Sequence, residues 1–229
     1  MRTQSQINLI KNRIIDPFLI DSILTDNEIK SLVRIFEEAQ GKTYKNTGPV
    51  TLDLPKDNLL LKEIISRLKE KLGPFEITAA FFFRTDYPHI IHNDDTFGLP
   101  NGVSKGITLP LTIEREFGEE LPRLCFFDQF YFHGPAKFFN GSKDIPTYYN
   151  ECLYDYKNVD GIIDTDFAWP TELLAHLKPQ WLKGLSLHST LEWKPGNALI
   201  FDSTRLHCAS DFRQLGIKSK LGISIFTKI

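Results

Sequence analysis

The sequence predicts a mainly β fold with N-terminal α-helices, built as an antiparallel sandwich or jelly roll. Before residue 75 apolar residues recur with a helical period, and from Glu76 onward short β-type runs are separated by turn signals, without regularly alternating helices. With 229 residues, 41% of them hydrophobic, the chain can bury a sizeable core. We therefore expect one domain over residues 1–229, with a helical region at about 14–75 and a β core at about 76–229.

Two amphipathic helices are expected in the first third of the chain. In "TDNEIKSLVRIFEEAQG", Thr25 and Glu28 have the spacing of a capping box, the apolar residues recur at i, i+3, i+4 and i+7, and Gly41 is a stop signal. A second helix is expected to begin near Asp57 and to end at Gly73. Each helix has one apolar face, so we expect the pair to brace one face of a sheet.

Six strands are expected after the helices, separated by Pro, Gly, Asn and Asp clusters such as "LPNGVSKG" and "KPGN". The stretch 134–184 is less regular, is rich in aromatic residues and includes a short helical piece near "PTELLAHL". The expected strands are "EITAAFFFR", "GITLPLTIE", "RLCFFDQFYF", "LSLHSTLEW", "NALIFDS" and "KLGISIFT".

Charge and cysteine content narrow the range of functions. The formal net charge is -2 and there is no basic block, so the composition argues against a nucleic-acid partner. The three cysteines are scattered and form no disulfide framework, which is typical of a reducing compartment. No apolar run is long enough to cross a membrane and the first residues lack the apolar core of a signal peptide, so we expect a cytoplasmic protein.

The stretch "YPHIIHNDDTFG" is the first candidate site. Side chains at i and i+2 of a strand share one face, so His92 and Asp94 would project together, whereas His89 would turn away. Asp95 would replace Asp94 only if the strand is bulged. With one further imidazole, this pair would complete the two-histidine, one-carboxylate arrangement that suits non-haem iron. A polar turn at a strand end is the alternative interpretation.

A third ligand is available near the C-terminus, where "LEWKPGNALIFDSTRLHCASDF" places His207 at or just past a strand. The ordered motifs are an N-terminal helical region, His-x-Asp after a strand, "PGNALIF" before a distal histidine, and a basic residue shortly before the last strand. Together, over roughly residues 14–229, they resemble the Fe(II)/2-oxoglutarate-dependent dioxygenases, particularly the phytanoyl-CoA-dioxygenase-like and prolyl-hydroxylase-like branches.

This resemblance implies a double-stranded β-helix (jelly roll) braced by helices, with Fe(II) and 2-oxoglutarate as cofactors. His92, Asp94 and His207 match the iron ligands. Lys220 in "KLGIS", four residues before Ser224 on the same face, matches the residue that binds the far carboxylate of 2-oxoglutarate. Most branches use Arg there, because its planar fork meets a carboxylate with two parallel hydrogen bonds. The two other candidates are Lys218 and Arg84.

The resemblance also implies hydroxylation of an unactivated C–H bond with O2 and release of succinate and CO2, because Asp94 keeps the carboxylate that related halogenases lack. A small molecule or a protein side chain would be the substrate, selected by residues 96–106 and 134–184. Arg205 would share the face of His207, where it could bind substrate or form a salt bridge.

Two alternatives remain open at this point. A cupin-like metal enzyme that does not use 2-oxoglutarate is favoured slightly by the missing Arg. A non-catalytic jelly-roll binding module predicts that the three candidate ligands are not clustered. The remaining histidines, His133, His176 and His188, are expected to be packed or hydrogen-bonded rather than ligands.

Overall fold

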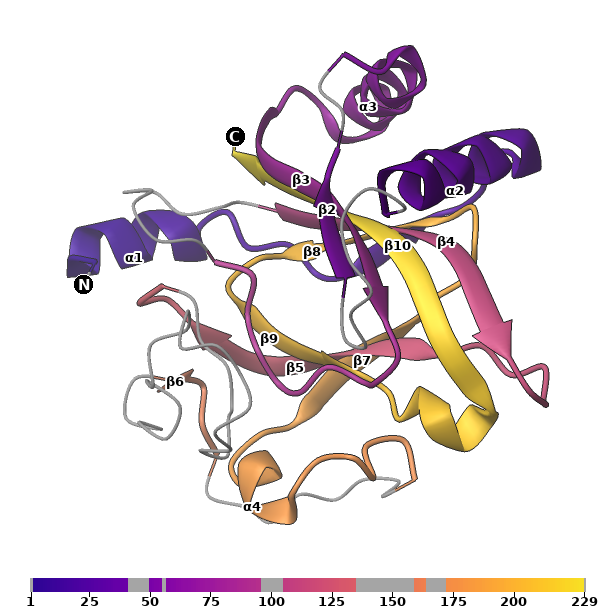
Figure 1. The fold of residues 1–229 in the computed structure, drawn as a ribbon. Coiled ribbons are helices and arrows are strands. Elements are labelled where there is room, and N and C mark those ends of the chain that lie inside the picture. The colour runs from indigo at the N-terminus through magenta and orange to yellow at the C-terminus, as the bar shows by residue number, and fades with distance from the viewer. Residues whose placement is uncertain are drawn as a thin grey trace.

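The computed structural model describes residues 2–40, 50–54, 57–95, 105–134, 159–163 and 172–228. Two antiparallel sheets face each other, and helices cover the outer side of the larger sheet (Figure 1). The predicted fold class, mainly β with N-terminal helices, is confirmed. No helix within these residues is long and apolar enough to cross a membrane.

The larger sheet has six strands and carries the longest strands of the molecule. Its order is β1-β8-β4-β10-β3-β2, and β10 pairs along most of its length with β4 on one side and β3 on the other. Four of these strands were predicted. The bounds are β1 (Phe18–Ile20), β2 (Val50–Asp53), β3 (Glu76–Thr85), β4 (Lys105–Arg115), β8 (Ala198–Asp202) and β10 (Ile217–Lys228).

The smaller sheet is organised around β5 (Arg123–Tyr131). One edge of β5 pairs with β9 (Arg205–Ala209), and the other with β7 (Leu187–Glu192) and β6 (Val159–Asp160). His92 joins the outer edge of β9 through an isolated bridge to His207. This bridge brings the His-x-Asp motif into the smaller sheet.

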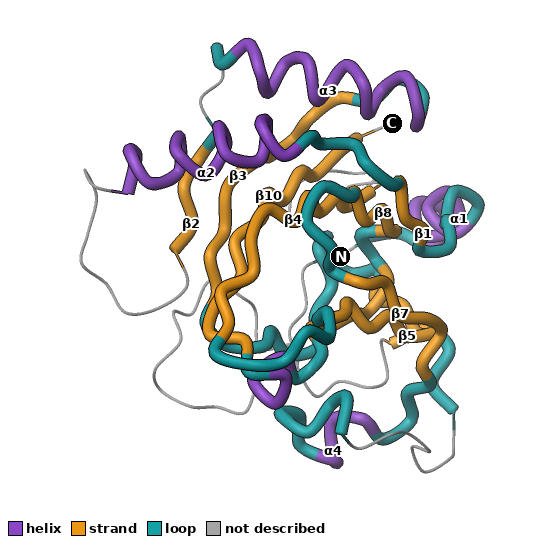
Figure 2. The backbone as a smooth tube through the Cα atoms, turned by 90° about the vertical axis from the view of Figure 1, so that its right-hand side faces the viewer, coloured by secondary structure: helices purple, strands orange, loops and turns teal. Residues whose placement is uncertain are grey.

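Helices α2 (Asp26–Gln40) and α3 (Leu59–Leu72) lie on the outer face of the six-stranded sheet (Figure 2). The predicted capping box is present, because the Thr25 amide donates to the Glu28 carboxylate at 2.8 Å and the Glu28 amide donates to the Thr25 hydroxyl at 3.3 Å. Asn58 caps α3 by accepting a hydrogen bond from the Leu61 amide at 3.2 Å. Buried apolar residues of both helices and of the strands below form the largest core cluster.

A further helix, α1 (Gln4–Lys11), precedes the predicted helical region, so the expectation that helices begin near residue 14 was wrong. Thr3 and Gln6 form a capping box at its start, in which each backbone amide donates to the other residue's side chain. The apolar face of α1 is narrow, with only Ile7 and Ile10 buried.

The expected helical piece near "PTELLAHL" is also corrected, because residues 172–176 form turns and the short helix α4 (Pro179–Leu182) follows them. This segment still buries apolar side chains. Leu174, Leu177 and Trp181 pack with Phe127 of β5 and cover the outer face of the smaller sheet. A short 3-10 helix, η3 (Phe212–Leu215), connects β9 to β10.

Candidate functional site

The structure brings together His92, Asp94 and His207. One ligand atom from each lies within 4.8 Å of the others. Nε2 of His92 is 3.7 Å from one carboxylate oxygen of Asp94, and Nε2 of His207 is 3.6 Å from the other oxygen. The carboxylate therefore stands between two imidazoles, and all three side chains converge on one point. This clustering contradicts the expectation that follows from a non-catalytic binding module.

Backbone hydrogen bonds fix the position of each of the three residues. His92 and His207 exchange both amide hydrogen bonds, at 2.9 Å and 2.8 Å. The amide of Asp94 donates to the carbonyl of Ser203 at 2.8 Å. Between them, the side-chain amide of Asn93 donates to the carbonyls of Tyr131 and Gly134, each at 3.0 Å. The motif is thus held by the β8–β9 turn on one side and by the end of β5 on the other.

The tautomer of each candidate imidazole is set by its backbone neighbour. Nδ1 of His92 is 2.7 Å from the carbonyl oxygen of Ile90, and Nδ1 of His207 is 3.0 Å from the carbonyl oxygen of Arg205. A carbonyl can only accept, so both Nδ1 atoms carry the proton in the neutral rings. Both Nε2 atoms then present a lone pair toward Asp94, as metal ligation requires.

The electrostatics of this cluster favour an ionised carboxylate. Burial acts to raise the pKa of Asp94, but attraction to the imidazoles of His207, His92 and His89 in their cationic form outweighs burial and holds that pKa below its usual value. The ring of His89 meets the ring of His92 edge-on, with centroids 5.7 Å apart. His89 therefore lies beside the cluster as a neighbour of His92.

Asp95, the alternative to Asp94, points elsewhere. Its side chain is fully buried in a two-pronged ion pair with Arg2, whose Nη2 is 2.8 Å from Oδ1 while Nη1 contacts Oδ2. Arg2 also donates to the carbonyl of Phe132 at 2.9 Å. Asp94 is therefore the carboxylate that the fold places between the two histidines.

Lys220 lies on β10, 3% exposed, on the strand face opposite that of Leu221, which packs in the core under the helices. Nζ is 4.8 Å from the ring centre of Trp193, which follows β7, and 4.7 Å from that of Phe212 in η3. No carboxylate contacts Nζ within the described residues. Burial lowers the pKa of Lys220 to about 7, an effect that the nearby Cys125 opposes only weakly.

Lys220 lies close to the β5–β9 ladder that carries His207 of the metal-type cluster. Cys125, which interacts electrostatically with Lys220, lies opposite Cys208 in the β5–β9 ladder, and Cys208 directly follows His207. On the other side, burial lowers the pKa of His176, and the Lys220 charge lowers it further. Nε2 of His176 lies 3.4 Å from the carbonyl oxygen of His89.

The two other candidates for binding 2-oxoglutarate, Arg84 and Lys218, lie away from Lys220. Arg84 pairs with Leu221 rather than with Lys220, so it points to the helix-covered face of the sheet, where its guanidinium is 5.8 Å from the ring centre of Phe36. Lys218 is about half exposed and forms a surface ion pair of 3.0 Å with Glu116. Neither position fits the expectation that these residues bind 2-oxoglutarate.

Ser224 shares the interior face of β10 with Lys220, because the residues between them alternate and Leu221 and Ile223 enter the core under the helices. Gly222 lies between the two. A side chain at Gly222 would meet the ring of Trp193 at 2.9 Å. The glycine therefore provides the space in which Trp193 packs beside Lys220.

Arg205 forms a salt bridge, one of its two expected roles. It is 3% exposed, donates to Asp16 and to the carbonyl of Phe127, each at 3.0 Å, and stacks 4.4 Å over the ring of Phe130. His188 bridges Asp128 at 2.9 Å and Asp16 at 3.3 Å on the same side of the smaller sheet.

The sequence alone did not single out Trp193 and Phe212 as site residues. Trp193 was read as the last residue of a strand, and Phe212 as one of eighteen Phe that fill the core. A usable signal existed for Trp193, since it stands directly before the "KPGN" turn at a strand end. Phe212 carried none, because its contact with Lys220 depends on the path of η3.

No family model and no curated protein sequence matches this chain. Solved structures do. SnoN, a non-heme α-ketoglutarate-dependent epimerase from nogalamycin biosynthesis, matches with a TM-score of 0.53 at 13% identity, over 97% of this chain and 82% of that chain. HygX from Streptomyces hygroscopicus, with nickel and 2-oxoglutarate bound, gives 0.51 at 13% identity, over 99% and 87%.

A third structure extends this agreement. SnoK, a non-heme α-ketoglutarate-dependent carbocyclase from nogalamycin biosynthesis, matches with a TM-score of 0.51 at 15% identity, over 98% of this chain and 83% of that chain. At these identities the likeness concerns the fold. The fold implied by the sequence resemblance is thus borne out, and the chain has the helix-braced jelly-roll fold that these solved structures share.

Proposed function

We propose that this protein is an Fe(II)- and 2-oxoglutarate-dependent oxygenase that hydroxylates an unactivated C–H bond of its substrate. The observation that carries the proposal is the combination of the His92, Asp94 and His207 cluster with one buried lysine, Lys220, close to the β5–β9 ladder that carries His207. The fold shared with SnoN and HygX supports the same class.

The donor set fits Fe(II). Two imidazole nitrogens and one carboxylate oxygen form a facial arrangement that leaves open coordination positions on the metal. In His92 and His207, the Nδ1–H bonds to Ile90 and Arg205 leave Nε2 as the donor. Asp94 is ionised and supplies the negative charge that a divalent cation favours. Iron bound there would supply the activation of O2.

Lys220 fits the distal carboxylate of 2-oxoglutarate. A buried ammonium without a carboxylate partner is costly, and a bound anion would remove that cost. The rings of Trp193 and Phe212 hold Nζ in place, so the charge is presented by a rigid frame. Ser224, on the same face of β10, would donate a hydrogen bond to the same carboxylate.

The reaction balances as substrate C–H plus O2 plus 2-oxoglutarate giving substrate C–OH, succinate and CO2. The chain contributes by holding 2-oxoglutarate through Lys220 and by keeping Asp94 as a ligand, which leaves no room for a halide in its place. We propose a small molecule or a protein side chain as the substrate, in a cytoplasmic setting. SnoN and SnoK, which share the fold, come from nogalamycin biosynthesis.

The test is anaerobic absorption spectroscopy of the Fe(II)-loaded protein during titration with 2-oxoglutarate. We expect a weak visible charge-transfer band that disappears in His207→Ala and is weakened in Lys220→Met. Lys218→Met is the matched control, because it removes a lysine from the same strand at an exposed position, and it should leave the band unchanged. Bound Fe(II) without a band in the wild-type protein would instead favour the cupin-like alternative.

A further inference from the structure

We propose that residues 2–16, here called the N-terminal strap, are a positioning element of the metal site, with Arg2 and Asp16 as its two anchoring residues. The strap forms a buried ion pair beside Asp94, and beside His207 it forms a second ion pair in which only the arginine is buried. This inference rests on the proposed function, because it concerns the affinity of the same site for a divalent metal.

The first anchor joins Arg2 to Asp95, the residue that directly follows Asp94. The side chains are 9% and 0% exposed, and both carboxylate oxygens are contacted. Two-pronged pairs of this type fix orientation as well as distance. Because Asp95 cannot turn without leaving a buried charge unpaired, the peptide between Asp94 and Asp95 is fixed as well.

The second anchor joins Asp16 to Arg205, two residues before His207. The guanidinium side chain of Arg205 is 4% exposed and lies 3.0 Å from the Asp16 carboxylate. The carbonyl of the same Arg205 accepts the Nδ1 proton of His207. Asp16 therefore holds the residue that orients the His207 imidazole, from the same segment of chain that carries Arg2.

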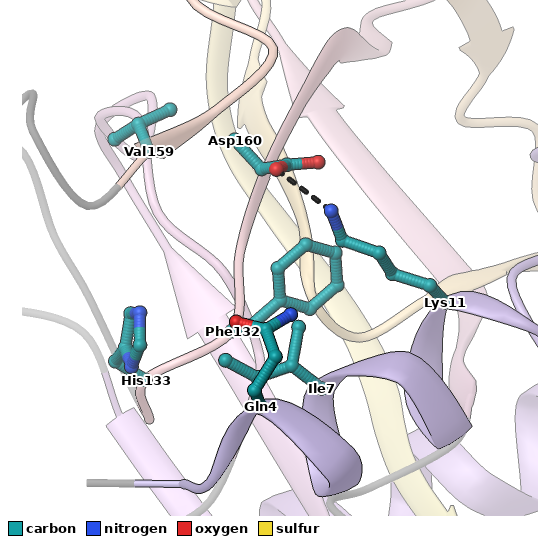
Figure 3. A pocket seen from close by; sticks show the side chains of 7 residues that line it. All are labelled: Gln4, Ile7, Lys11, Phe132, His133, Val159 and Asp160. Atoms are coloured by element: carbon teal, nitrogen blue, oxygen red, sulfur yellow. Dashed lines mark hydrogen bonds and ion pairs between the residues drawn. The ribbon is translucent and has the colours of Figure 1, made fainter.

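Apolar packing places the middle of the strap, because Ile14 packs against the same small cluster as helix α1 and Ile15 packs against the largest core cluster, and the polar anchors lie at its two ends. Helix α1 buries Ile7 and Ile10 in a small cluster with Phe132. A pocket of about 170 Å³ separates the helix from β6, as Figure 3 shows, and Lys11 reaches across it to Asp160 through an exposed ion pair of 2.8 Å. That exposed pair contributes little, since solvent screens the attraction between surface charges.

The anchors should therefore act on metal binding as the outer partners of metal ligands do. Loss of such a partner typically lowers metal affinity by about 10–100-fold. Arg2 should show the effect more strongly than Asp16, because both sides of its pair are buried whereas the Asp16 side chain is 75% exposed. Loss of an anchor should weaken the affinity for the metal and leave the affinity for 2-oxoglutarate unchanged. The reason is that Lys220, which would bind 2-oxoglutarate, belongs to β10 and not to a segment that the strap holds.

The experiment measures the Co(II) dissociation constant of the full chain by calorimetry and by the visible Co(II) spectrum. We expect Arg2→Met to weaken Co(II) binding by about 10-fold or more, and Arg2→Lys to recover part of it because the charge is kept. Lys11→Met is the control from the same strap, and we expect it to stay within about two-fold of the wild type. For Co(II)-loaded Arg2→Lys, the 2-oxoglutarate dissociation constant should match the wild-type value.

Unchanged Co(II) affinity in Arg2→Met, or equal losses in Arg2→Met and Lys11→Met, would overturn the strap as a positioning element while leaving the proposed function intact. A wild-type chain that binds no Co(II) would overturn the proposed function and this inference together. If Arg2→Met does not fold, Arg2→Lys decides, because a lysine makes one contact where the arginine makes two, and an affinity equal to wild type would contradict the role of the pair.

Discussion

His92 and His207 exchange both of their backbone amide hydrogen bonds, at 2.9 Å and 2.8 Å, and their ring centres lie 4.3 Å apart. This pairing occurs at an isolated bridge, outside any regular strand that contains His92. Two residues far apart in the chain are thus joined by the backbone itself, so the position of the two imidazoles does not depend on a bound metal.

Removal of one imidazole should therefore abolish metal binding without unfolding the chain. We expect Co(II) to raise the melting temperature of the wild-type protein, because a ligand that binds only the folded state stabilises it, and to leave that of His207→Ala unchanged. The measurement is thermal unfolding with and without Co(II). His133→Ala is the control, since His133 follows β5 outside the cluster, and it should keep the wild-type shift. A retained shift in His207→Ala would contradict the assignment.

The affinity for 2-oxoglutarate should depend on pH through Lys220. The pKa of Lys220 is lowered to about 7 by burial, and only the ammonium form attracts a carboxylate. Below about pH 7 the dissociation constant should be flat, and above it the constant should rise by up to about tenfold per pH unit as the free protein loses this proton. Calorimetry of the Co(II)-loaded protein between about pH 6 and pH 9 measures this dependence.

Lys220→Arg provides the control for this pH dependence. A guanidinium stays protonated over the whole range, so the affinity of this variant should lose the pH-dependent component. An equally steep rise in Lys220→Arg would assign the titration to another group, and a flat profile in the wild type would contradict the role of Lys220.

Lys220→Met should make the protein more stable at neutral pH. The folded-state pKa of about 7 lies below the ordinary value of 10.5, so the folded state binds fewer protons than the unfolded state between these two values. The free energy of unfolding of the wild type therefore rises as pH increases through this window. Below the window, the buried charge on Lys220 lowers the free energy of unfolding by its full amount. Methionine removes the buried charge, at the loss of two cation–π contacts, for a net gain of roughly 1–3 kcal/mol at pH 6. Denaturant unfolding should show this gain shrinking toward pH 10, and a destabilised variant at pH 6 would contradict the buried-charge account.

The sequence could predict the metal-type cluster because its information is local and ordered. His92 and Asp94 are two residues apart, and "PGNALIF" marks the approach to His207. The sequence could not decide whether Lys220 or Arg84 faces the site, because the two residues lie on paired strands. The run "AAFFFR" is apolar on both faces of β3, so a period of two does not indicate which face carries the interior.

The helices also show that a local sequence pattern cannot predict contacts between distant segments. Thr25 with Glu28 and Thr3 with Gln6 are both capping boxes, yet only the first precedes a broad apolar stripe. Helix α1 is stabilised mainly by contacts that no local pattern encodes. The pair between Arg2 and Asp95 joins residues 93 positions apart, and it forms only when the jelly roll is assembled.

Gly222→Ala should weaken 2-oxoglutarate binding although it adds only a methyl group. The new carbon would lie 2.9 Å from the ring of Trp193, 3.1 Å from the ring of Phe83 and 3.1 Å from the carbonyl of Leu109. Trp193 is 1% exposed and cannot yield freely, so the ring must move away from Lys220 or the strand must shift, at a cost of about 1–3 kcal/mol.

Gly222→Ala should therefore change both the stability of the protein and its affinity for 2-oxoglutarate. Thermal unfolding measures the first quantity and calorimetry the second. We expect a lower melting temperature, a higher dissociation constant for 2-oxoglutarate and unchanged Co(II) affinity, because the three candidate ligands lie outside β10. Ser219→Ala, a change of similar size at a rim position of the same strand, should affect neither quantity strongly, since it removes only a surface hydrogen bond to Glu114. If Gly222→Ala loses stability and keeps wild-type affinity for 2-oxoglutarate, then the Trp193 ring contributes to packing alone and Lys220 does not depend on it.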